Sequence, residues 1–265
     1  MVKLGKILRK GRGMFLAYDQ GLEHGPTDFN DKNVDPLYII DIAKRGKFTA
    51  LIFQKGIAEK YSVEIKKSKV PLIVKLNGKT NLVKGEPVSR AICSVDEAVD
   101  LGAVAVGYTI YIGSEFEEEM LSEAGEVIEE AHSRGLPVVV WIYPRGKSLR
   151  DLPRGNREQV IGNRKKRSRE GELMAYAARV GLEIGADIVK LHSTGVKGDV
   201  EWTVESAGKC KVVVAGGVKR KETDLIREVS MSVKAGCVGV AIGRNVWQAS
   251  DPVLVSKKLR KVVFG

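Results

Sequence analysis

The sequence lacks any long apolar run, and it contains only three cysteines and three histidines in 265 residues. A membrane-spanning helix needs about eighteen or more apolar residues in succession, and no such stretch occurs. Residues 1–13 are basic but have no apolar core, so we expect no secretory signal. Cys93, Cys210 and Cys237 lie far apart, in or beside apolar segments. This placement indicates buried thiols in a reducing cytoplasm rather than a disulfide framework or a metal knuckle.

The net charge of +11 comes mostly from one segment, residues 145–169. It holds ten Lys or Arg and two acidic residues, whereas the rest of the chain is nearly balanced. We interpret it as a basic insertion that is solvated or contacts another subunit. Because phosphate-binding and nucleic-acid-binding proteins share the same electrostatics, phosphate attraction and nucleic-acid binding are kept as alternatives for this segment.

Short apolar runs alternate with amphipathic segments along the whole chain. Eight runs have the composition of buried strands: 15–19, 50–53, 72–76, 103–108, 138–143, 187–192, 212–217 and 238–243. Five intervening segments repeat apolar residues at three- and four-residue spacing and close on a glycine, as helices do: 36–46, 95–102, 117–135, 173–185 and 224–236. A weaker helix is expected within 53–69.

Continuous apolar strands separated by helices predict a parallel sheet that is covered by helices. Eight such units favour a single (β/α)₈ TIM barrel over residues 1–265, with the basic insertion as its one irregular segment. A doubly wound sheet is the weaker interpretation, because no G-x-G-x-x-G turn follows the first strand. No linker rich in Pro, Gly or Ser divides the chain.

In a barrel, chemistry is expected at the mouth formed by the C-terminal ends of the strands. Side chains alternate between the two faces of a strand, so residues of one parity share a face. This rule places five polar or aromatic side chains in the barrel interior near one mouth: Asp19, Lys75, Trp141, Tyr143 and Lys190. Tyr143 is suited to proton transfer, although tyrosines in such positions also serve only in packing.

Lys190 is the most informative of these residues. It lies between Val189 and Leu191 in an apolar strand, where its ammonium group cannot easily reach solvent, and burying an unpaired ammonium is costly. We expect burial and the nearby charge of Lys75 to lower the pKa of Lys190 and leave a nucleophilic amine, as Schiff-base formation on a carbonyl substrate requires. The alternative is a lysine held in a buried ion pair with Asp19.

The last two predicted strands end in glycine-rich turns. Gly216 and Gly217 follow the seventh strand, and Gly243 and Arg244 follow the eighth. In such barrels these two loops commonly bind phosphate through backbone N–H groups, and the arginine adds positive charge. The alternative is that both are only tight turns.

Eight short motifs together point to a known family: YDQGLEHGP, FQKGIAEKY, KLNGKT, GEPVS, VGYTIYIGS, VVWIYPRG, ADIVKLHSTG and GRNVWQ. In this order, from about residue 12 to about residue 250, they resemble the archaeal-type class I fructose-1,6-bisphosphate aldolases, also called DhnA-type aldolases. The resemblance implies a (β/α)₈ barrel that forms an imine between a lysine and dihydroxyacetone phosphate. It also implies cleavage of fructose 1,6-bisphosphate without a metal or other cofactor, and assembly into homo-oligomers, often decamers.

The resemblance assigns roles to particular positions of this chain. The implied catalytic residues are Lys190 as the imine lysine, Tyr143 as the proton donor and acceptor, and Asp19. The implied substrate contacts are Gln20, His24, Asp28, Gln54, Lys75, Trp141 and Arg145. The implied phosphate site is formed by Gly216, Gly217, Gly243 and Arg244. Glu23, within the first motif, receives no role.

Three features depart from the family pattern. Ala215 precedes the glycine pair where the family often has Ser, and His192 and Ser193 follow the imine lysine where the family often has Tyr. The basic segment also looks longer than the usual connection. The first two bear on substrate preference, and the third bears on assembly or on the reach to the second phosphate.

Four other functions are considered. A metal-dependent aldolase would use His24 and His192, but the three histidines form no ligand-spaced pair. A 2-amino-3,7-dideoxy-heptulosonate synthase resembles this family closely, although its first motif reads more like D-H-G-x-S. A sugar-phosphate isomerase would not need a lysine embedded in a strand, and nucleic-acid binding would rest on the basic segment alone.

The expected partner is therefore a sugar phosphate. We expect no membrane association and no metal or other cofactor, and we do not favour a nucleic acid. We expect a cytoplasmic homo-oligomer.

Overall fold

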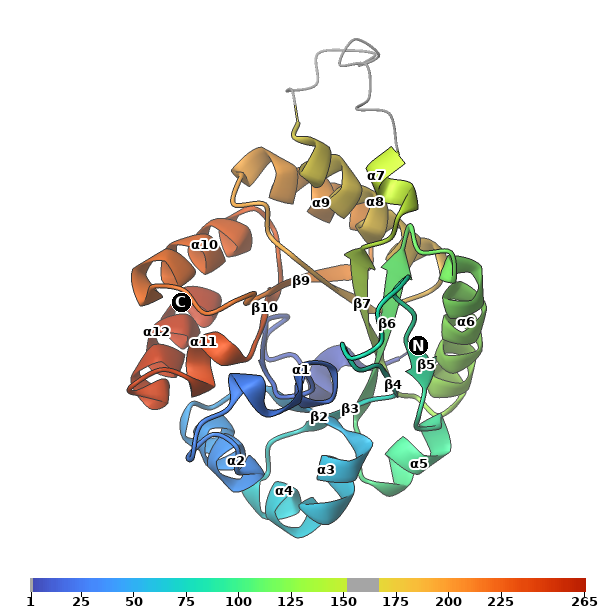
Figure 1. Cartoon of the computed structure of the whole chain (residues 1–265). Coiled ribbons are helices and arrows are strands. Elements are labelled where there is room, and N and C mark those ends of the chain that lie inside the picture. Colours follow the sequence, from blue (N-terminus) through green and yellow to red (C-terminus); the bar gives the residue numbers. More distant parts are fainter. Residues whose placement is uncertain (1, 152–166) are drawn as a thin grey trace.

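Eight parallel strands form a closed barrel in the computed structural model, which describes residues 2–151 and 167–265 (Figure 1). The barrel strands are β1 (Gly13–Ala17), β2 (Ala50–Gln54), β3 (Leu72–Lys75), β6 (Ala105–Ile112), β7 (Val138–Pro144), β8 (Ile188–Leu191), β9 (Lys211–Ala215) and β10 (Gly239–Ile242). Around the barrel they follow the order β1, β10, β9, β8, β7, β6, β3, β2. The predicted TIM-barrel fold is confirmed.

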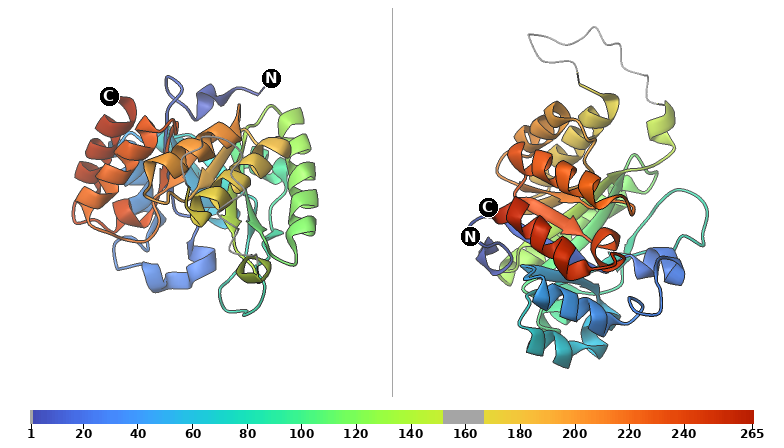
Figure 2. Two further views of the ribbon diagram at one scale, coloured as in Figure 1. Left: turned by 90° about the horizontal axis from the view of Figure 1, so that it is seen from above. Right: turned by 90° about the vertical axis from the view of Figure 1, so that its left-hand side faces the viewer.

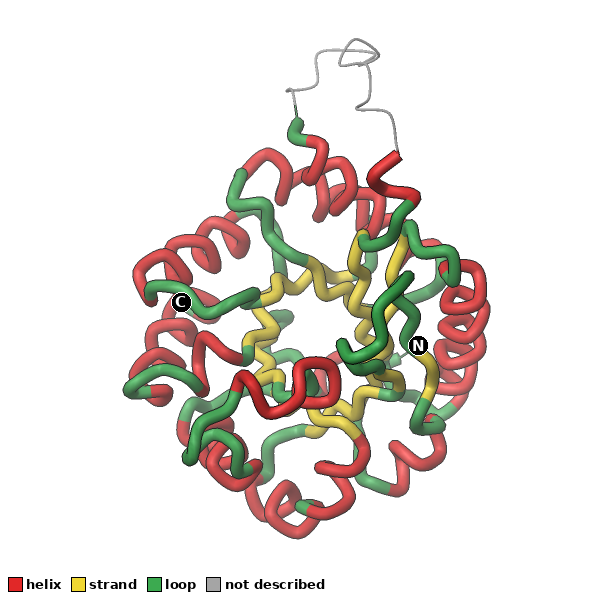
Figure 3. The backbone as a smooth tube through the Cα atoms, viewed as in Figure 1, coloured by secondary structure: helices red, strands yellow, loops and turns green. Residues whose placement is uncertain are grey.

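Helices surround the barrel as an outer ring (Figure 3). They are α2 (Pro36–Arg45), α3 (Lys55–Lys60), α4 (Ser62–Ser68), α5 (Val95–Asp100), α6 (Glu117–Ser133), α8 (Arg169–Glu183), α9 (Lys197–Ala207), α10 (Glu222–Lys234) and α12 (Pro252–Phe264). Several begin at a side-chain cap, such as Asp35, which accepts a hydrogen bond from the Leu37 N–H. The weak helix expected within 53–69 is two short helices that meet at Tyr61.

Smaller elements close the two ends of the barrel (Figure 2). At the N-terminal end of the strands lies the 3₁₀ helix Leu4–Lys6, and Ile7 and Leu8 pack after it into the barrel interior. The elements at the opposite mouth are α1 (Gly21–His24), the 3₁₀ helix Gly25–Asp28, the ribbon of β4 (Asn77–Gly78) and β5 (Arg90–Ala91), α7 (Ser148–Asp151) and α11 (Arg244–Trp247). These connections shape the entrance to the barrel.

Two apolar layers confirm the alternation predicted along the strands. The inner layer fills the barrel and includes Ile188 and Trp141. The outer layer packs between strands and helices and includes Val189 and Leu191. Lys190 therefore has apolar neighbours in the chain that point outward, while its own side chain follows Ile188 into the interior.

Three predictions about the elements need correction. β1 ends at Ala17, so Asp19 lies two residues beyond the strand that was expected to include it. β6 runs to Ile112 instead of ending at residue 108. The helices α9 and α12 were not predicted. α9 has few buried apolar positions, and α12 lies in a basic C-terminal segment that begins at an Asp251 cap.

The central part of the predicted basic insertion, residues 152–166, lies outside the described residues. Of the helices that the structure describes, none has the length and apolar character that a membrane crossing requires.

Candidate active site

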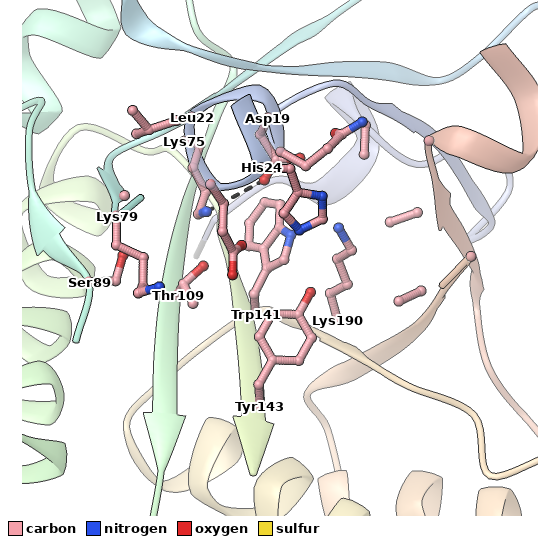
Figure 4. Close-up of a pocket in the computed structure, with 18 of the residues that line it drawn as sticks. Asp19, Leu22, His24, Lys75, Lys79, Ser89, Thr109, Trp141, Tyr143 and Lys190 are labelled. Atoms are coloured by element: carbon pink, nitrogen blue, oxygen red, sulfur yellow. Dashed lines mark hydrogen bonds and ion pairs between the residues drawn. The ribbon is translucent and has the colours of Figure 1, made fainter. Parts of the chain in front are cut away.

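A cavity opens at the carboxyl ends of the strands, inside the mouth of the barrel (Figure 4). The predicted site residues that line it are Asp19, Gln20, His24, Gln54, Lys75, Trp141, Tyr143, Arg145, Lys190, Gly216, Gly217, Gly243 and Arg244. The structure describes every residue of the predicted set. Among them, only Asp28 does not line this cavity.

Lys190 lies on β8 with its side chain inside the barrel. The residue is 6% exposed, and its Nζ lies 4.8 Å from the centre of the Trp141 ring on the neighbouring strand β7. Burial lowers the pKa of Lys190 to about 8. The charge of Lys75 acts in the same direction, and that of Asp19 opposes it. At pH 7 about a tenth of Lys190 is therefore uncharged amine, against less than about a thousandth for an ordinary lysine, and nucleophilic attack on a carbonyl requires this neutral form.

Asp19 is held by Lys75 rather than by Lys190. Its Oδ2 lies 3.5 Å from Lys75 Nζ, whereas the ion pairs among the described residues include none with Lys190. The alternative of a simple Lys190–Asp19 ion pair is therefore not what the structure contains. Burial alone would raise the pKa of Asp19, but the charges of Lys190 and Lys75 hold it below its usual range, so the carboxylate is ionised.

The residue before Asp19 explains its direction. Tyr18 points to the outer layer, where its ring stacks on Phe29 at 5.1 Å and meets the edge of Trp247 at 5.8 Å. Its hydroxyl donates a hydrogen bond of 2.6 Å to the Asn33 carbonyl. Because Tyr18 is fixed outward, the next side chain turns into the cavity.

Tyr143 lies at the end of β7, between two aromatic rings and a guanidinium. Its ring centre is 5.0 Å from that of His192 and 6.2 Å from that of Tyr111, and Arg145 Cζ lies 5.1 Å from it. Burial raises the pKa of Tyr143, and the charge of Asp19 adds to the effect, so the phenol stays protonated at neutral pH. Burial lowers the pKa of His192 to about 4, so Tyr143 faces a neutral imidazole.

Trp141 occupies space that a glycine provides. A Cβ at Gly107, on the adjacent strand β6, would lie 2.3 Å from the Trp141 Cζ3 atom. Such a contact is far closer than van der Waals packing permits. Lys75 Nζ lies 5.3 Å from the same indole, so Trp141 contacts both lysines of the cavity floor.

The two glycine-rich turns lie side by side at the ends of β9 and β10. Gly217 has a positive φ of +67°, which favours glycine there. A Cβ at Gly243 would lie 2.6 Å from the Ala17 carbonyl oxygen, so glycine is needed for this close approach. Gly216 donates its N–H to the Ala241 carbonyl at 3.2 Å. The N–H groups of Gly217 and Gly243 have no acceptor within the described part of the chain and are available to an anion.

Asn245 and Arg220 hold the first of these turns in place. The Asn245 side chain donates to the carbonyls of Gly216 and Val218, each at 2.8 Å, and accepts from the Arg220 N–H at 2.9 Å. The Arg220 guanidinium donates to the Gly216 carbonyl at 2.9 Å and pairs with Glu228. Sequence motifs did not identify this clamp, because it joins a loop to a helix about 25 residues away.

Asp28 contacts the cavity through two other residues. Its Oδ2 lies 2.6 Å from His24 Nδ1 and 3.5 Å from Arg244 Nη1. Asp28 thus holds His24 and Arg244, both of which line the cavity, and its own contact with the substrate stays a prediction. Loop residues such as Asp28 cannot be placed by strand alternation.

Several lining residues were not predicted. They are Ala17, Leu22, Glu23, Gly78, Lys79, Ser89, Thr109, Tyr111, His192, Ala215 and Ala241. Thr109 and Tyr111 follow the inward parity of β6, and a longer predicted strand would have identified them. Glu23, left without a role, has its Oε1 3.5 Å from Arg145 Nη1.

Four buried polar atoms that face this region have no hydrogen-bond partner among the described residues: Gln20 Nε2, Gln54 Oε1, Thr109 Oγ1 and Trp141 Nε1. Buried polar groups are normally paired, so a cluster of unpaired ones in one cavity indicates a polar ligand. The described residues contain no group of three or more His, Cys, Asp or Glu side chains arranged to hold a metal ion.

Residues 13–249 match the DeoC/LacD family of aldolases. A class 1 fructose-bisphosphate aldolase from Thermoproteus tenax is 46% identical over 97% of this chain and 91% of the relative. A 2-amino-3,7-dideoxy-D-threo-hept-6-ulosonate synthase from Archaeoglobus fulgidus is 30% identical over 99% of this chain and 90% of the relative.

The fold also matches a solved archaeal fructose-1,6-bisphosphate aldolase whose catalytic Lys is covalently bound to the carbinolamine intermediate of the substrate. That structure is 44% identical, covers 99% of this chain and 98% of its own, and has a TM-score of 0.86. The motifs indicated this resemblance, and the matches over nearly the whole length confirm it: the chain belongs to the DeoC/LacD family of aldolases.

Proposed function

We propose that this chain is a class I fructose-1,6-bisphosphate aldolase. It cleaves the sugar to dihydroxyacetone phosphate and glyceraldehyde 3-phosphate, and it catalyses the reverse condensation in glycolysis and gluconeogenesis. The observation that carries the proposal is the buried Lys190 amine, with a pKa of about 8, against Trp141 in a cavity that also holds two glycine-rich turns. The relatives named as such aldolases support the same reaction.

The first steps use Lys190 and Tyr143. The neutral Lys190 amine attacks the ketone carbon, and its nitrogen forms the new C–N bond as the carbonyl oxygen takes up a proton. Loss of that oxygen as water gives a protonated imine. Tyr143, which its raised pKa keeps protonated, supplies and takes back protons in these steps.

Carbon–carbon cleavage uses Asp19. The ionised carboxylate accepts the proton of the hydroxyl next to the breaking bond, the aldehyde leaves, and the bonding electrons enter the protonated imine to form an enamine. Since the imine is the electron sink, the proposed chemistry needs no metal ion. Tyr143 is the proton donor that returns the enamine to the imine, which water then hydrolyses.

Substrate binding is proposed to use the phosphate on dihydroxyacetone phosphate as an anchor. The free N–H groups of Gly217 and Gly243 and the guanidinium of Arg244 converge on one side of the cavity. His24, held by Asp28, and Gln20 stand on the first loop. The carbonyl then lies toward Lys190, at the centre of the barrel mouth.

A coupled assay tests the proposal. Purified protein is given fructose 1,6-bisphosphate in the presence of a metal chelator, and both triose phosphates are measured enzymatically. We expect both products in equal amounts and no effect of the chelator. Absence of triose phosphates, or complete inhibition by the chelator, would contradict the proposal.

A second candidate is a heptulosonate-type synthase, which the 30% identical relative supports. It would use the same lysine chemistry on a different acceptor. Condensation assays with the corresponding acceptor would show activity, while fructose 1,6-bisphosphate would not be cleaved.

We also expect a cytoplasmic homo-oligomer with a single barrel domain. Sedimentation or light scattering measures the oligomer. Nucleic-acid binding by the basic segment is tested by deleting residues 145–169: a filter-binding signal that survives the deletion has another cause.

A further inference from the structure

We propose that His192 is a positioning residue for proton transfer: its ring packs against the Tyr143 phenol and holds the hydroxyl where enamine protonation requires it. This inference rests on the proposed aldolase function, in which Tyr143 returns the enamine to the imine. In that step the Tyr143 O–H bond breaks and its proton forms the new C–H bond with the electrons of the enamine double bond. The nitrogen lone pair restores the C=N bond, and water returns a proton to the phenolate.

His192 lies beside Tyr143 because their strands are paired in register. Trp141 on β7 is the partner of Lys190 on β8. Tyr143 and His192 each lie two residues further along, so they are neighbours with the same inward parity. Their ring centres are 5.0 Å apart, at an interplanar angle of 33°. On β6, Tyr111 is the register partner of Tyr143, so rings from both neighbouring strands flank the phenol.

Ring packing is what fixes the Tyr143 hydroxyl. No hydrogen bond ties this hydroxyl to a residue in the described part of the chain. Its ring instead has Tyr111 and His192 on its two sides, and the Arg145 guanidinium lies 5.1 Å from its centre. In the view of Figure 4 the Tyr143 hydroxyl is directed to the same part of the cavity as the Lys190 amine. Loss of a flanking ring should therefore let the phenol turn away from the reacting carbon.

The charge state of His192 suits a ring that packs. Burial lowers the pKa of His192 to about 4, and the charges of Arg145 and Lys190 act in the same direction. A neutral imidazole adds no positive charge beside the phenol or beside the imine nitrogen. The imidazole makes no hydrogen bond with the residues that the structure describes, so the contact with Tyr143 is what accounts for its place.

The test isolates the proton transfer by supplying dihydroxyacetone phosphate alone, in deuterated water. Without an aldehyde, the enzyme exchanges a hydrogen on the hydroxymethyl carbon next to the imine for deuterium, and NMR measures the rate. His192→Ala removes the ring, His192→Leu fills space without a planar ring, and His192→Phe keeps a planar ring without nitrogen. We expect kcat for exchange to fall about tenfold to a hundredfold in His192→Ala and His192→Leu, because a misplaced proton donor reacts slowly.

The planar ring of His192→Phe should restore exchange to within about threefold of the wild-type kcat. The KM for dihydroxyacetone phosphate should change by less than about twofold in all three variants, since the ring acts on a step after binding.

A double-mutant cycle shows whether His192 acts through Tyr143. Tyr143→Phe keeps the ring and removes the phenolic proton, and in that background His192→Ala should lower the residual exchange by less than about twofold. His132→Ala is the matched control, since His132 pairs with Asp187 and does not line the cavity. It should leave the exchange rate unchanged.

Three results would disprove the positioning role: wild-type exchange in His192→Ala and His192→Leu, an equal loss in His192→Phe, or a loss as large in the Tyr143→Phe background. A raised KM that His192→Phe does not restore would show a substrate contact instead, and would also disprove it. If His192→Ala does not fold, the comparison of His192→Leu with His192→Phe decides.

Borohydride trapping with dihydroxyacetone phosphate separates the two proposals. If the wild type gives no adduct, the proposed function fails. If the wild type is trapped while the variants without a planar ring exchange at its rate, only the role of His192 fails.

Discussion

Lys190 Nζ lies 4.8 Å from the centre of the Trp141 ring, and Trp141 fits there because Gly107 has no side chain. The two residues are partners in register on the adjacent strands β7 and β8. An amine against an aromatic face inside a barrel is poorly solvated, and its charged form is disfavoured. This relationship produces both the lowered pKa and the reactivity of Lys190.

The pH dependence of the reaction follows from that pKa. Attack needs the neutral amine, so kcat/KM should rise with pH and level off above an inflection near pH 8. Lys75→Met should move this inflection to higher pH, because the charge of Lys75 lowers the pKa of Lys190. Lys84→Met, at an exposed position that does not line the cavity, should leave it in place. A profile that is flat between pH 6 and 9, or an inflection that moves to lower pH in Lys75→Met, contradicts this assignment.

Burial of Lys190 should also cost stability. Its pKa is about 8 when folded against an ordinary value of 10.5, so the folded state disfavours the proton. Stability is therefore reduced below pH 8 and recovers as pH rises toward 10.5. At pH 7 we expect Lys190→Met to raise the free energy of unfolding by up to about 3 kcal/mol. Urea unfolding from pH 7 to pH 10 measures this gain, which should shrink with rising pH. A gain that does not depend on pH would require another explanation.

Gly107 should not tolerate a larger residue. Gly107→Ala places a Cβ on the Trp141 ring, and we expect a loss of about 1–3 kcal/mol in stability together with a fall in kcat. Gly125→Ala is the control of opposite sign. Gly125 is exposed on α6, a Cβ there meets nothing within 4 Å, and alanine should stabilise the helix by about 0.5–1 kcal/mol. Denaturant unfolding measures the stability of both variants, and steady-state kinetics measures their kcat. Equal changes in stability and kcat in Gly107→Ala and Gly125→Ala would contradict the packing argument.

Asn245 should control phosphate affinity through the loop it clamps. Asn245→Ala removes the donors to the Gly216 and Val218 carbonyls and the acceptor of the Arg220 N–H, and each lost hydrogen bond costs about 0.5–1.5 kcal/mol. We expect the KM for fructose 1,6-bisphosphate to rise about tenfold. Trapping with dihydroxyacetone, which has no phosphate, should proceed at the wild-type rate. Slower trapping with this phosphate-free ketone would mean that Asn245 acts on more than the phosphate loop.

The sequence predicted the fold and most of the cavity for a physical reason. Strand alternation is a strict geometric rule, so the positions of Lys75, Trp141 and Lys190 along their strands are enough to assign them to the interior. The glycine-rich turns could be located because only backbone without a side chain approaches an anion that closely. Family motifs then supplied Gln20, His24 and Gln54, which strand parity could not place.

The remaining residues depend on contacts that local sequence does not encode. Lys79 lies beside a two-stranded ribbon with no periodic signal, and Asn245 joins segments far apart in the chain. Asp28 was assigned to the substrate from its motif, but its contacts with His24 and Arg244 could not be predicted from the sequence. Tyr111 was missed because the predicted strand was too short. Such errors arise where loops and strand ends are set by tertiary packing.

The most direct test of the account is chemical trapping of the imine. The protein is mixed with dihydroxyacetone phosphate and sodium borohydride, digested, and mapped by mass spectrometry. We predict one reduced adduct, on the peptide that contains Lys190, in the wild type, and none in Lys190→Met. An adduct that persists in Lys190→Met, or that maps to another lysine in the wild type, would contradict the central claim.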